Sequence, residues 1–577
     1  MRSTDLARWL CGVLAVSVLS ATPALAQGDG KGKGKDDGKG KGKDNGKGKG
    51  KDDGSGGFYH HPPPACSAKC GPEQYLTVQT TNGPITGHLA PNTSCVLEYL
   101  GIPYAQPPVG DLRFAPPQPI AQQSPFVADQ FGFDCPLSPS APVTNFPDLT
   151  PQALDIIKYF ATGAGTPQSE DCLTLNIWTK ATAKASAKKK PVLVFFYGGR
   201  FTIGNTNSPF YTGRHFAEAE DIVVVTVNYR VNIFGFPGAP GEPHNLGLRD
   251  QRLAVEWVRD NIGAFGGDKD RIVIAGQSSG GVAADYWAYA YASDPIAAGL
   301  ILVSGNAFSF PVNAPNVPLQ NWNTVVGLLG CNETTTTDAE VLACMRSKDW
   351  QDIKAAAATV RPSPSTSILR SIPPFYPHPD GELVFDDYVS LTASGAFARI
   401  PVLGGHNHYE AGYYRIPAFA QGRVPTPEQV DSFHLESFTC PVSYQAEARK
   451  QHGVPTWAYR YFGDWDNTRL YPDSGAYHGV DLHMIFGNSE EVSGIPPSEA
   501  QQQVTKEMQH AWYTFARDPE KGLEKELGWP KWDHDSPTLV GLAYNNEPGA
   551  KVIDPSVYDA PCSTVVMGAL GTPTPTP

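Results

Sequence analysis

Short runs of β-branched and aromatic residues recur along the chain and predict strands: Val192–Tyr197, Ile222–Tyr229, Ile272–Ala275, Leu300–Ser304, Pro401–Gly404 and Thr456–Tyr461. Each run is apolar at consecutive positions, which is typical of strands covered on both faces of a sheet. Segments of helical length lie between them, for example Gln251–Ile262 and Gln501–Arg517. This alternation predicts an α/β fold with a large, mostly parallel central sheet and helices on both faces.

The N-terminal segment has the layout of a secretion signal. Arg2 and Arg8 precede an apolar run, and small residues lead up to Ala26. The run, Leu10–Leu19, is shorter than the roughly 20 residues of a membrane-spanning helix. We therefore predict a cleaved signal peptide over residues 1–26, a secreted, extracellular protein, and no stable membrane insertion.

Residues 30–53 are three copies of an eight-residue Gly, Lys and Asp unit without any apolar residue. Such a tract cannot form a packed core, so residues 27–57 are interpreted as a disordered linker. A weak role in tethering the chain to a surface is the alternative. A lead-in with Pro and Cys over residues 58–74, a globular domain over 75–566 and a disordered Thr/Pro tail over 567–577 complete the predicted organisation.

The net charge of −13 makes a nucleic-acid partner improbable on electrostatic grounds. Ten cysteines are present, and removal of Cys11 with the signal leaves an odd number in a compartment where disulfides persist. At least one cysteine is then unpaired or forms an intermolecular bond. Asn92 and Asn332 begin sequons that fit a glycosylated surface.

One motif carries the chemistry of a nucleophile. The strand ending at Ala275 leads into Gly276-Gln277-Ser278-Ser279-Gly280 and then into a helical pattern. This is GxSxG at a strand-to-helix turn, where the flanking glycines allow a sharp bend that exposes the serine hydroxyl. Only Ser278 has glycine two residues away on both sides, so Ser278 is the predicted nucleophile and the amide of Ser279 a predicted oxyanion donor.

A second glycine cluster, Gly198-Gly199-Arg200, follows an earlier predicted strand. Alone it would be an ordinary turn. Together with the serine turn it predicts an oxyanion hole, in which the amides of Gly199 and Arg200 join that of Ser279.

Three further stretches are characteristic in sequence: Tyr99–Gly110, Ser169–Trp178 and Asn245–Trp257. Together with the two glycine motifs they cover nearly the whole globular part. With them the chain resembles the type-B carboxylesterase and cholinesterase-like family of α/β-hydrolases, most of all its fungal secreted members. The resemblance implies an α/β-hydrolase fold and a serine carboxylesterase that acts on a small-molecule ester through an acyl-enzyme. We expect neither a cofactor nor a metal.

The resemblance also selects the other two members of a triad. His478 takes the position of the family's catalytic histidine, while His483 falls where the family has a variable residue, and Glu410 takes the position of the family acid. The chain order Ser278, Glu410, His478 is that of α/β-hydrolases. The family pattern further implies disulfides, namely Cys135 with Cys172, Cys331 with Cys344 and Cys440 with Cys562, and leaves the pairing of Cys66, Cys70 and Cys95 open.

The chain departs from the family pattern in ways that bear on substrate. Arg200 replaces a usual third glycine, and we expect its side chain to leave the pocket. Gln277 replaces a common Glu, which removes a charge that favours cationic substrates. No Trp lies between Cys135 and Cys172 to stack on choline, which argues against a cholinesterase. In that loop, Phe146, Tyr159 and Phe160 either line a pocket or pack the loop.

Two other functions stay open at this stage. A lipase that acts on long acyl chains should carry an apolar lid in the loop between the first paired cysteines, and this loop is Pro-rich and only moderately apolar. A non-catalytic adhesion or scaffold protein of the same fold should have lost a triad residue, and all three are present here. The sequence does not indicate an oligomeric state.

Overall fold

The computed structural model describes residues 76–121, 124–138, 143–161, 165–181, 188–332, 337–363, 365, 367–565 and 567. The predicted signal peptide, linker and lead-in over residues 1–74 lie outside the described residues, as does all of the predicted tail except Met567. The described residues all belong to one compact unit.

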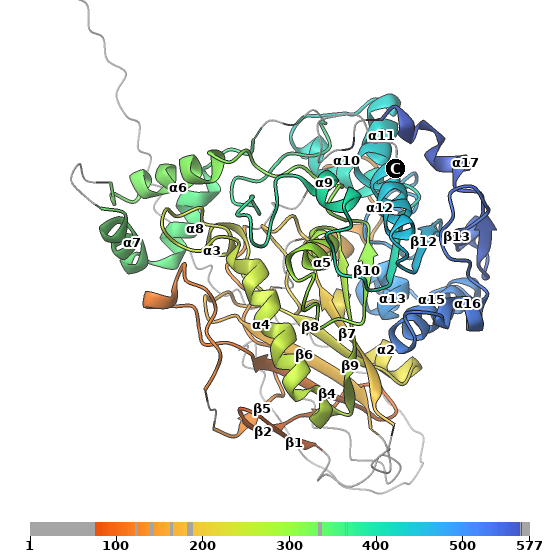
Figure 1. Cartoon of the computed structure of the whole chain (residues 1–577), viewed down its shortest axis with the longest axis horizontal. Helices are drawn as coiled ribbons and strands as arrows, with labels where there is room; N and C mark the ends of the chain where they lie inside the picture. Colours follow the sequence, from red (N-terminus) through yellow and green to blue (C-terminus); the bar gives the residue numbers. More distant parts are fainter. Residues whose placement is uncertain are drawn as a thin grey trace, which may run out of the picture. The chain divides into compact units, whose positions relative to one another are not determined.

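An 11-stranded sheet forms the centre of this unit, in the order β14-β13-β12-β11-β10-β9-β7-β8-β6-β4-β3 (Figure 1). From β13 to β8 every neighbouring pair is parallel, and both margins are antiparallel. The strands are β3 His88–Leu89, β4 Val96–Pro103, β6 Thr174–Lys180, β7 Lys190–Phe196, β8 Val223–Val227, β9 Gly267–Gln277, β10 Gly299–Val303, β11 Val402–Asn407, β12 Thr456–Tyr461, β13 Leu539–Leu542 and β14 Lys551–Ile553. A small separate sheet joins β1 Thr77–Thr80, β2 Gly83–Thr86 and β5 Phe126–Val127.

The central strands are buried at every position, from β7 and β8 through β10, β11 and β12. A strand buried along its whole length needs cover on both faces, which explains why its sequence does not alternate. The helices are α1 Ala153–Ala161, α2 Arg214–Ala219, α3 Asn232–Gly235, α4 Leu246–Asn261, α5 Ser279–Ala290, α6 Val317–Leu328, α7 Asp338–Ser347, α8 Trp350–Ala358, α9 Tyr388–Ala393, α10 Ala411–Ala420, α11 Pro427–His434, α12 Cys440–Gln451, α13 Leu482–Phe486, α14 Ser489–Ser493, α15 Glu499–Arg517, α16 Gly522–Leu527 and α17 Ser556–Asp559.

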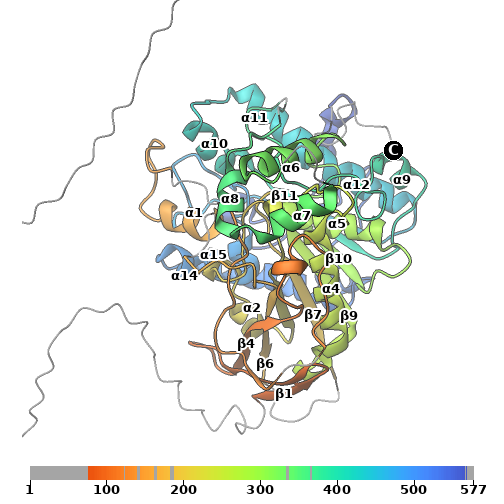
Figure 2. The same ribbon diagram turned by 90° about the vertical axis from the view of Figure 1, so that its left-hand side faces the viewer.

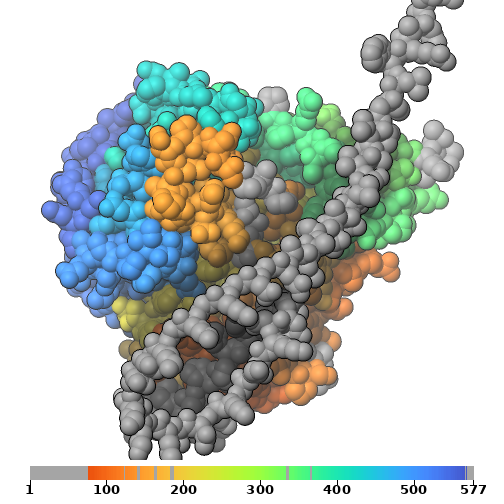
Figure 3. Space-filling view, turned by 180° about the vertical axis from the view of Figure 1, so that it is seen from behind, coloured from red at the N-terminus to blue at the C-terminus, as the bar shows by residue number. Residues whose placement is uncertain are grey.

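A second apolar cluster lies apart from the sheet, beneath α6, α7 and α8, which gather on one side of the unit (Figure 2). Its centre includes Trp322, Met345 and Ile353. On the side seen in Figure 3, α1 lies beside the C-terminal elements and contacts α14.

The sequence predicted this fold class correctly. All six predicted strands and both predicted helices are present, with ends that differ by a few residues. Five strands at the margins of the sheet, namely β3, β4, β6, β13 and β14, were not predicted. β4 contains Glu98 and Pro103, and the polar Asn176 and Thr179 interrupt β6, so neither has a continuous apolar run.

The structure contains the three disulfides that the family pattern implied: Cys135–Cys172, Cys331–Cys344 and Cys440–Cys562. Cys95 is also disulfide-bonded. Within the described ranges, no helix combines the length and the hydropathy required to cross a bilayer.

Candidate active site

Ser278 occupies the sharp turn between β9 and α5. Its backbone has φ 57° and ψ −123°, a strained combination that GxSxG turns impose on the serine. The glycines around it leave no room for side chains: a Cβ on Gly276 would lie 2.1 Å from the carbonyl oxygen of Gly280, and one on Gly305 would lie 2.2 Å from that of Ser278. The glycine residues of the motif therefore fix the position of the serine.

His478 and Glu410 meet in the interior at the carboxyl ends of the strands. Glu410 follows β11, His478 lies in the connection after β12, and these two strands are neighbours in the sheet. The Nδ1 of His478 lies 2.5 Å from Oε2 of Glu410. Because a carboxylate only accepts, this contact places the ring proton on Nδ1 and leaves Nε2 as an acceptor.

The carboxylate of Glu410 is fully buried and both of its oxygens are used. Its Oε1 accepts hydrogen bonds from the hydroxyl of Ser304 at 2.7 Å and from the amide of Asn407 at 2.6 Å. These donors hold the carboxylate in one orientation. Glu410 is therefore placed to orient the imidazole and to stabilise it when it gains a proton.

In this structure the partner of the His478 Nε2 atom is Gln277. The side-chain amide of Gln277 donates to Nε2 at 3.1 Å, and no hydrogen bond joins Ser278 to His478 in the described part of the chain. Ser278 and His478 are 3% and 2% exposed. Catalytic hydrogen bonds are often formed only with substrate bound, so the serine hydroxyl has to replace Gln277 at Nε2 for proton transfer.

The glycine cluster after β7 lies directly against the serine turn. A Cβ on Gly198 would lie 2.9 Å from the Cβ of Ser278. Gly199 and Arg200 have φ of 119° and 57°, both in the region that favours glycine. Among the described residues the amides of Gly199, Arg200 and Ser279 have no acceptor, as an oxyanion hole requires.

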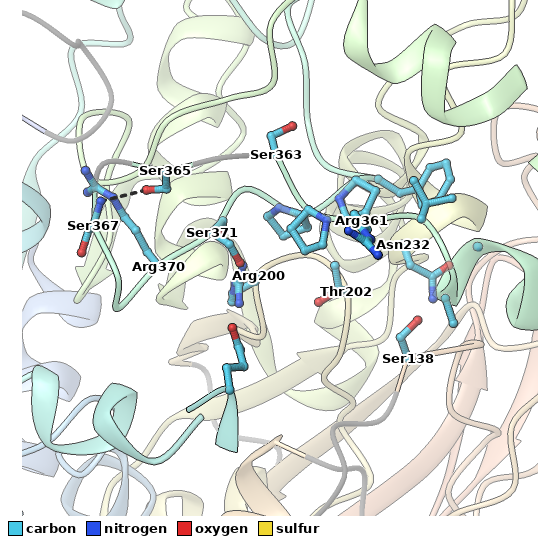
Figure 4. Close-up of a pocket in the computed structure, with 18 of the residues that line it drawn as sticks. Ser138, Arg200, Thr202, Asn232, Arg361, Ser363, Ser365, Ser367, Arg370 and Ser371 are labelled. Atoms are coloured by element: carbon cyan, nitrogen blue, oxygen red, sulfur yellow. Dashed lines mark hydrogen bonds between the residues drawn. The ribbon is translucent and has the colours of Figure 1, made fainter. Parts of the chain in front are cut away.

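A small pocket of about 30 Å³ at Ser278 adjoins a larger cavity of about 820 Å³. Arg200, Arg370 and Ser371 line both, and Figure 4 shows Arg200 between Arg370 and Arg361 in that view. The expectation that the side chain of Arg200 leaves the pocket is wrong. Its guanidinium stays at the pocket because it donates to Ser371, to the hydroxyl at 2.9 Å and also to the backbone carbonyl.

The aromatic residues of the loop between Cys135 and Cys172 mostly pack against the protein. Phe146 packs against Phe419 and Tyr471. The ring of Phe160 lies 6.3 Å from that of His478. Neither these two nor Tyr159 line the pocket at Ser278, so their packing role is the one that the structure supports.

Sequence reasoning missed a second buried acid behind the triad. Asp481 accepts from the side-chain amide of Asn407 at 3.0 Å and from the hydroxyl of Tyr459 at 3.1 Å. Burial raises the pKa of Asp481 to about 6. An Asp three residues after a histidine is a weak sequence signal, and only the fold shows that it supports the loop containing Glu410.

His483, the other histidine near this position, lies away from the serine. Its Nδ1 pairs with Asn488 at 3.2 Å, its ring packs 4.6 Å from that of Phe210, and burial lowers its pKa to about 4. The described residues contain no group of three or more His, Cys, Asp or Glu side chains that could hold a metal ion.

Comparison with known proteins agrees with this geometry. The model of the carboxylesterase family matches residues 74–426 and 421–555. The chain belongs to the carboxylesterase family. Its α/β-hydrolase fold and its class of reaction, the hydrolysis of carboxylic esters, follow from this membership.

Individual members of the carboxylesterase family differ in their named substrates. A chlorogenic acid esterase of Aspergillus niger is 33% identical over 495 residues, which cover 81% of this chain and 90% of the relative. Secreted lipase 5 of Gibberella zeae is 31% identical over 82% of this chain and 91% of the lipase. An acetylcholinesterase of Bungarus fasciatus is 28% identical over 84% of this chain and 85% of the relative.

Proposed function

We propose that this carboxylesterase acts through a Ser278-His478-Glu410 triad and an acyl-enzyme. His478 Nε2 takes the proton of the Ser278 hydroxyl as the oxygen attacks the ester carbonyl. The tetrahedral oxyanion is held by the amides of Gly199, Arg200 and Ser279. His478 then returns the proton to the departing alcohol, which leaves the acyl group on the serine.

The second half of the reaction repeats the same steps with water. His478 takes a proton from water as the water oxygen attacks the acyl carbonyl, and the proton passes to Ser278 when the acid leaves. Glu410 orients His478 and stabilises the imidazolium in both halves.

The contact between Glu410 and His478 is the observation that supports this proposal most strongly. It fixes the tautomer in which Nε2 can act as a base, within a buried site beside a strained serine turn. The free amides next to Ser278 add the second requirement for acyl transfer, a preorganised site for the oxyanion.

We also propose that the enzyme is secreted, with residues 1–26 as a signal peptide, 27–57 as a linker, 58–74 as a lead-in, 75–566 as the catalytic domain and 567–577 as a tail. Three disulfides suit an oxidising compartment. One of the relatives that cover most of the chain is named a secreted lipase.

Soluble, polar esters are the substrates that the cavity favours. Arginine and serine account for nearly half of the residues that line it, and these side chains can bind the polar groups of an ester. Hydrolysis of long acyl chains is the alternative that the lipase relative suggests.

The proposal is tested with the mature protein and a Ser278→Ala variant on p-nitrophenyl acetate, butyrate and palmitate and on a choline ester. We expect the wild type to hydrolyse the short esters and the variant to lose activity by roughly 10⁶-fold. A preference for short chains supports the esterase, and a preference for palmitate supports the lipase.

A serine-directed organophosphate gives an independent readout. It should label the wild type and leave Ser278→Ala unlabelled, as shown by mass spectrometry of the peptide that contains residue 278. A wild type that neither turns over esters nor reacts with the organophosphate contradicts the triad and favours a scaffold role.

A further inference from the structure

Among the described residues, the charged side chains that line the cavity beside Ser278 are all positive. We call Arg200, Arg361, Arg370 and Arg423 the arginine wall, because all four line this cavity. No Asp, Glu or Lys of the described ranges lines the cavity or the pocket at Ser278. The chain as a whole has a net charge of −13, so a cavity whose charged lining residues are all arginines contrasts with the rest of the protein.

The arginine wall is only partly neutralised from within. Arg370 forms an ion pair with Glu436 at 3.2 Å and donates to the hydroxyl of Ser437 at 2.7 Å. In the described part of the chain, the other three arginines of the wall have no ion pair. Arg200 is held by Ser371, a neutral partner, and so keeps its full charge.

Arg370 gives a second, independent indication of a ligand. It is 8% exposed and lines both the pocket at Ser278 and the larger cavity. Its Nε–H is buried without a hydrogen-bond acceptor. A buried donor without a partner lowers stability, and such groups in native proteins need an explanation. Burial also lowers the pKa of Arg370, although the neighbouring Glu436 acts in the opposite direction.

We propose that the arginine wall binds a carboxylate carried by the substrate, so that the enzyme prefers esters with a free carboxylate in one of their two halves. This inference rests on the proposed function of Ser278. The planar guanidinium presents paired donors that match the two oxygens of a carboxylate. An anion there would pair with Arg200, which has no acidic partner among the described residues.

The size and the polar lining of the cavity agree with such a ligand. A volume of about 820 Å³ lies within the usual range for small-molecule sites. Hydroxyl groups of Thr202, Ser363 and Ser371 add donors and acceptors around the arginines. Because Arg200 and Ser278 line the same pocket, one substrate can reach both the nucleophile and the arginine wall.

Matched ester pairs test the preference for each half of the substrate. For the acyl half, the mono-4-nitrophenyl ester of adipic acid is compared with 4-nitrophenyl hexanoate, which has the same chain without the carboxylate. For the alcohol half, 4-acetoxybenzoate is compared with methyl 4-acetoxybenzoate. We expect kcat/KM to favour the anionic member of at least one pair by roughly tenfold or more, the scale of a charge-assisted hydrogen bond.

Variants of the arginine wall then test whether its residues cause the preference for anionic esters. Arg370→Gln should reduce the ratio of kcat/KM for the anionic ester to kcat/KM for the neutral ester by roughly tenfold, and this ratio is unaffected by any change in rate that both esters share. The double variant Arg361→Gln/Arg423→Gln removes two exposed charges that have no ion pair, and should reduce the preference by about threefold without loss of folding. Arg259→Gln is the matched control, since Arg259 pairs with Asp260 on the surface, and it should leave the preference unchanged.

Two results overturn the inference. One is a wild type that hydrolyses neutral esters but shows no preference for either anionic ester, and the other is a preference that survives in both wall variants. In either case the proposed function stands, because ester turnover that depends on Ser278 is intact.

Failure of the proposed function is recognised separately. Calorimetry with Ser278→Ala measures binding of 4-acetoxybenzoate and its methyl ester without turnover. Tighter binding of the anion, lost in Ser278→Ala/Arg370→Gln, supports the arginine wall even if no ester is hydrolysed. Equal binding of the two compounds contradicts it.

Discussion

The two sides of the pocket at Ser278 are built in different ways. On one side Ser278 lines the pocket, and Gln277, His478 and Glu410 lie buried behind it. We call these four residues the triad wall, which is held by the ends of β9 and β11. On the other side, the arginine wall draws Arg361 and the arginines after it from irregular segments that follow α8 and α10. The triad wall is fixed by backbone geometry, whereas the arginine wall consists of long side chains on connections.

This difference suggests that the triad wall performs the chemistry and the arginine wall determines the selectivity for substrates. The steps of acyl transfer need atoms held within a fraction of an ångström, which strand ends and a strained turn provide. Recognition of a distant charge tolerates more freedom, so long arginine side chains on loops can supply it. Changes in the triad wall should therefore lower the rate for every ester, and changes in the arginine wall should alter the choice among esters.

The largest effect is expected for Glu410→Gln. The amide of the new residue would donate to Nδ1, which places the ring proton on Nε2 and removes the base. We expect kcat/KM to fall by roughly 10⁴-fold, as when a triad acid becomes an amide in other serine hydrolases. Stopped assays with 4-nitrophenyl hexanoate and its anionic counterpart should show the same fold loss for both.

Asp481→Asn is the matched control for that variant. Asp481 is the other buried acid near the triad, but its partners are Asn407 and Tyr459 and not His478. Its loss should reduce kcat/KM by less than about tenfold, the scale of a disturbed neighbouring hydrogen bond. A larger loss in Asp481→Asn than in Glu410→Gln would show that Asp481, and not Glu410, is the acid of the triad.

A smaller effect is expected when a charge is added to the triad wall by Gln277→Glu. Gln277 lies beside Ser278, so a carboxylate at this position should oppose the positive potential of the arginine wall, weaken the preference for anionic esters and favour a choline ester. At a separation of several ångströms and an intermediate dielectric, the change in the ratio of kcat/KM values should be about fivefold. The ratio of the two kcat/KM values, measured at pH 8, is unaffected by any change in rate that both substrates share.

Gln277→Leu controls for the loss of the hydrogen bond to His478 without the added charge. It should change the absolute rates and leave the anion-to-neutral ratio close to that of the wild type. A ratio that shifts equally in both variants contradicts an electrostatic origin.

The sequence predicted the triad wall better than the arginine wall, for physical reasons. The GxSxG turn has a local requirement for glycine on both sides of Ser278, and that requirement is visible in the sequence. His478 and Glu410 have no such local signal, and only the resemblance to a family placed them. The structure brings them together at 2.5 Å, while their role in catalysis stays a prediction.

The arginine wall could not be predicted because its members are far apart in the chain. Arg200, Arg370 and Arg423 meet through the fold alone, and each would otherwise be read as a surface charge. The prediction that Arg200 points away failed for the same reason, since its partner Ser371 lies 171 residues along the chain.

The smallest effect on activity is expected for His483→Gln, behind the triad wall. His483 pairs with Asn488 and does not contact the pocket, so kcat/KM should stay within about twofold of the wild type, whereas His478→Gln should lose at least roughly 10⁴-fold. This pair of variants decides directly which of the two neighbouring histidines is the base.

The effect of His483→Gln on the stability of the fold should depend on pH. Burial lowers the pKa of His483 to about 4, whereas the unfolded chain takes up this proton near pH 6.5. Between these values the unfolded state binds more protons, so the contribution of His483 is complete above about pH 6.5 and is lost as the pH falls towards 4. Urea unfolding at pH 7 and pH 4.5 should show a loss of stability that is smaller in His483→Gln by about 2 kcal/mol. An equal loss in the wild type and the variant would mean that His483 titrates alike in both states.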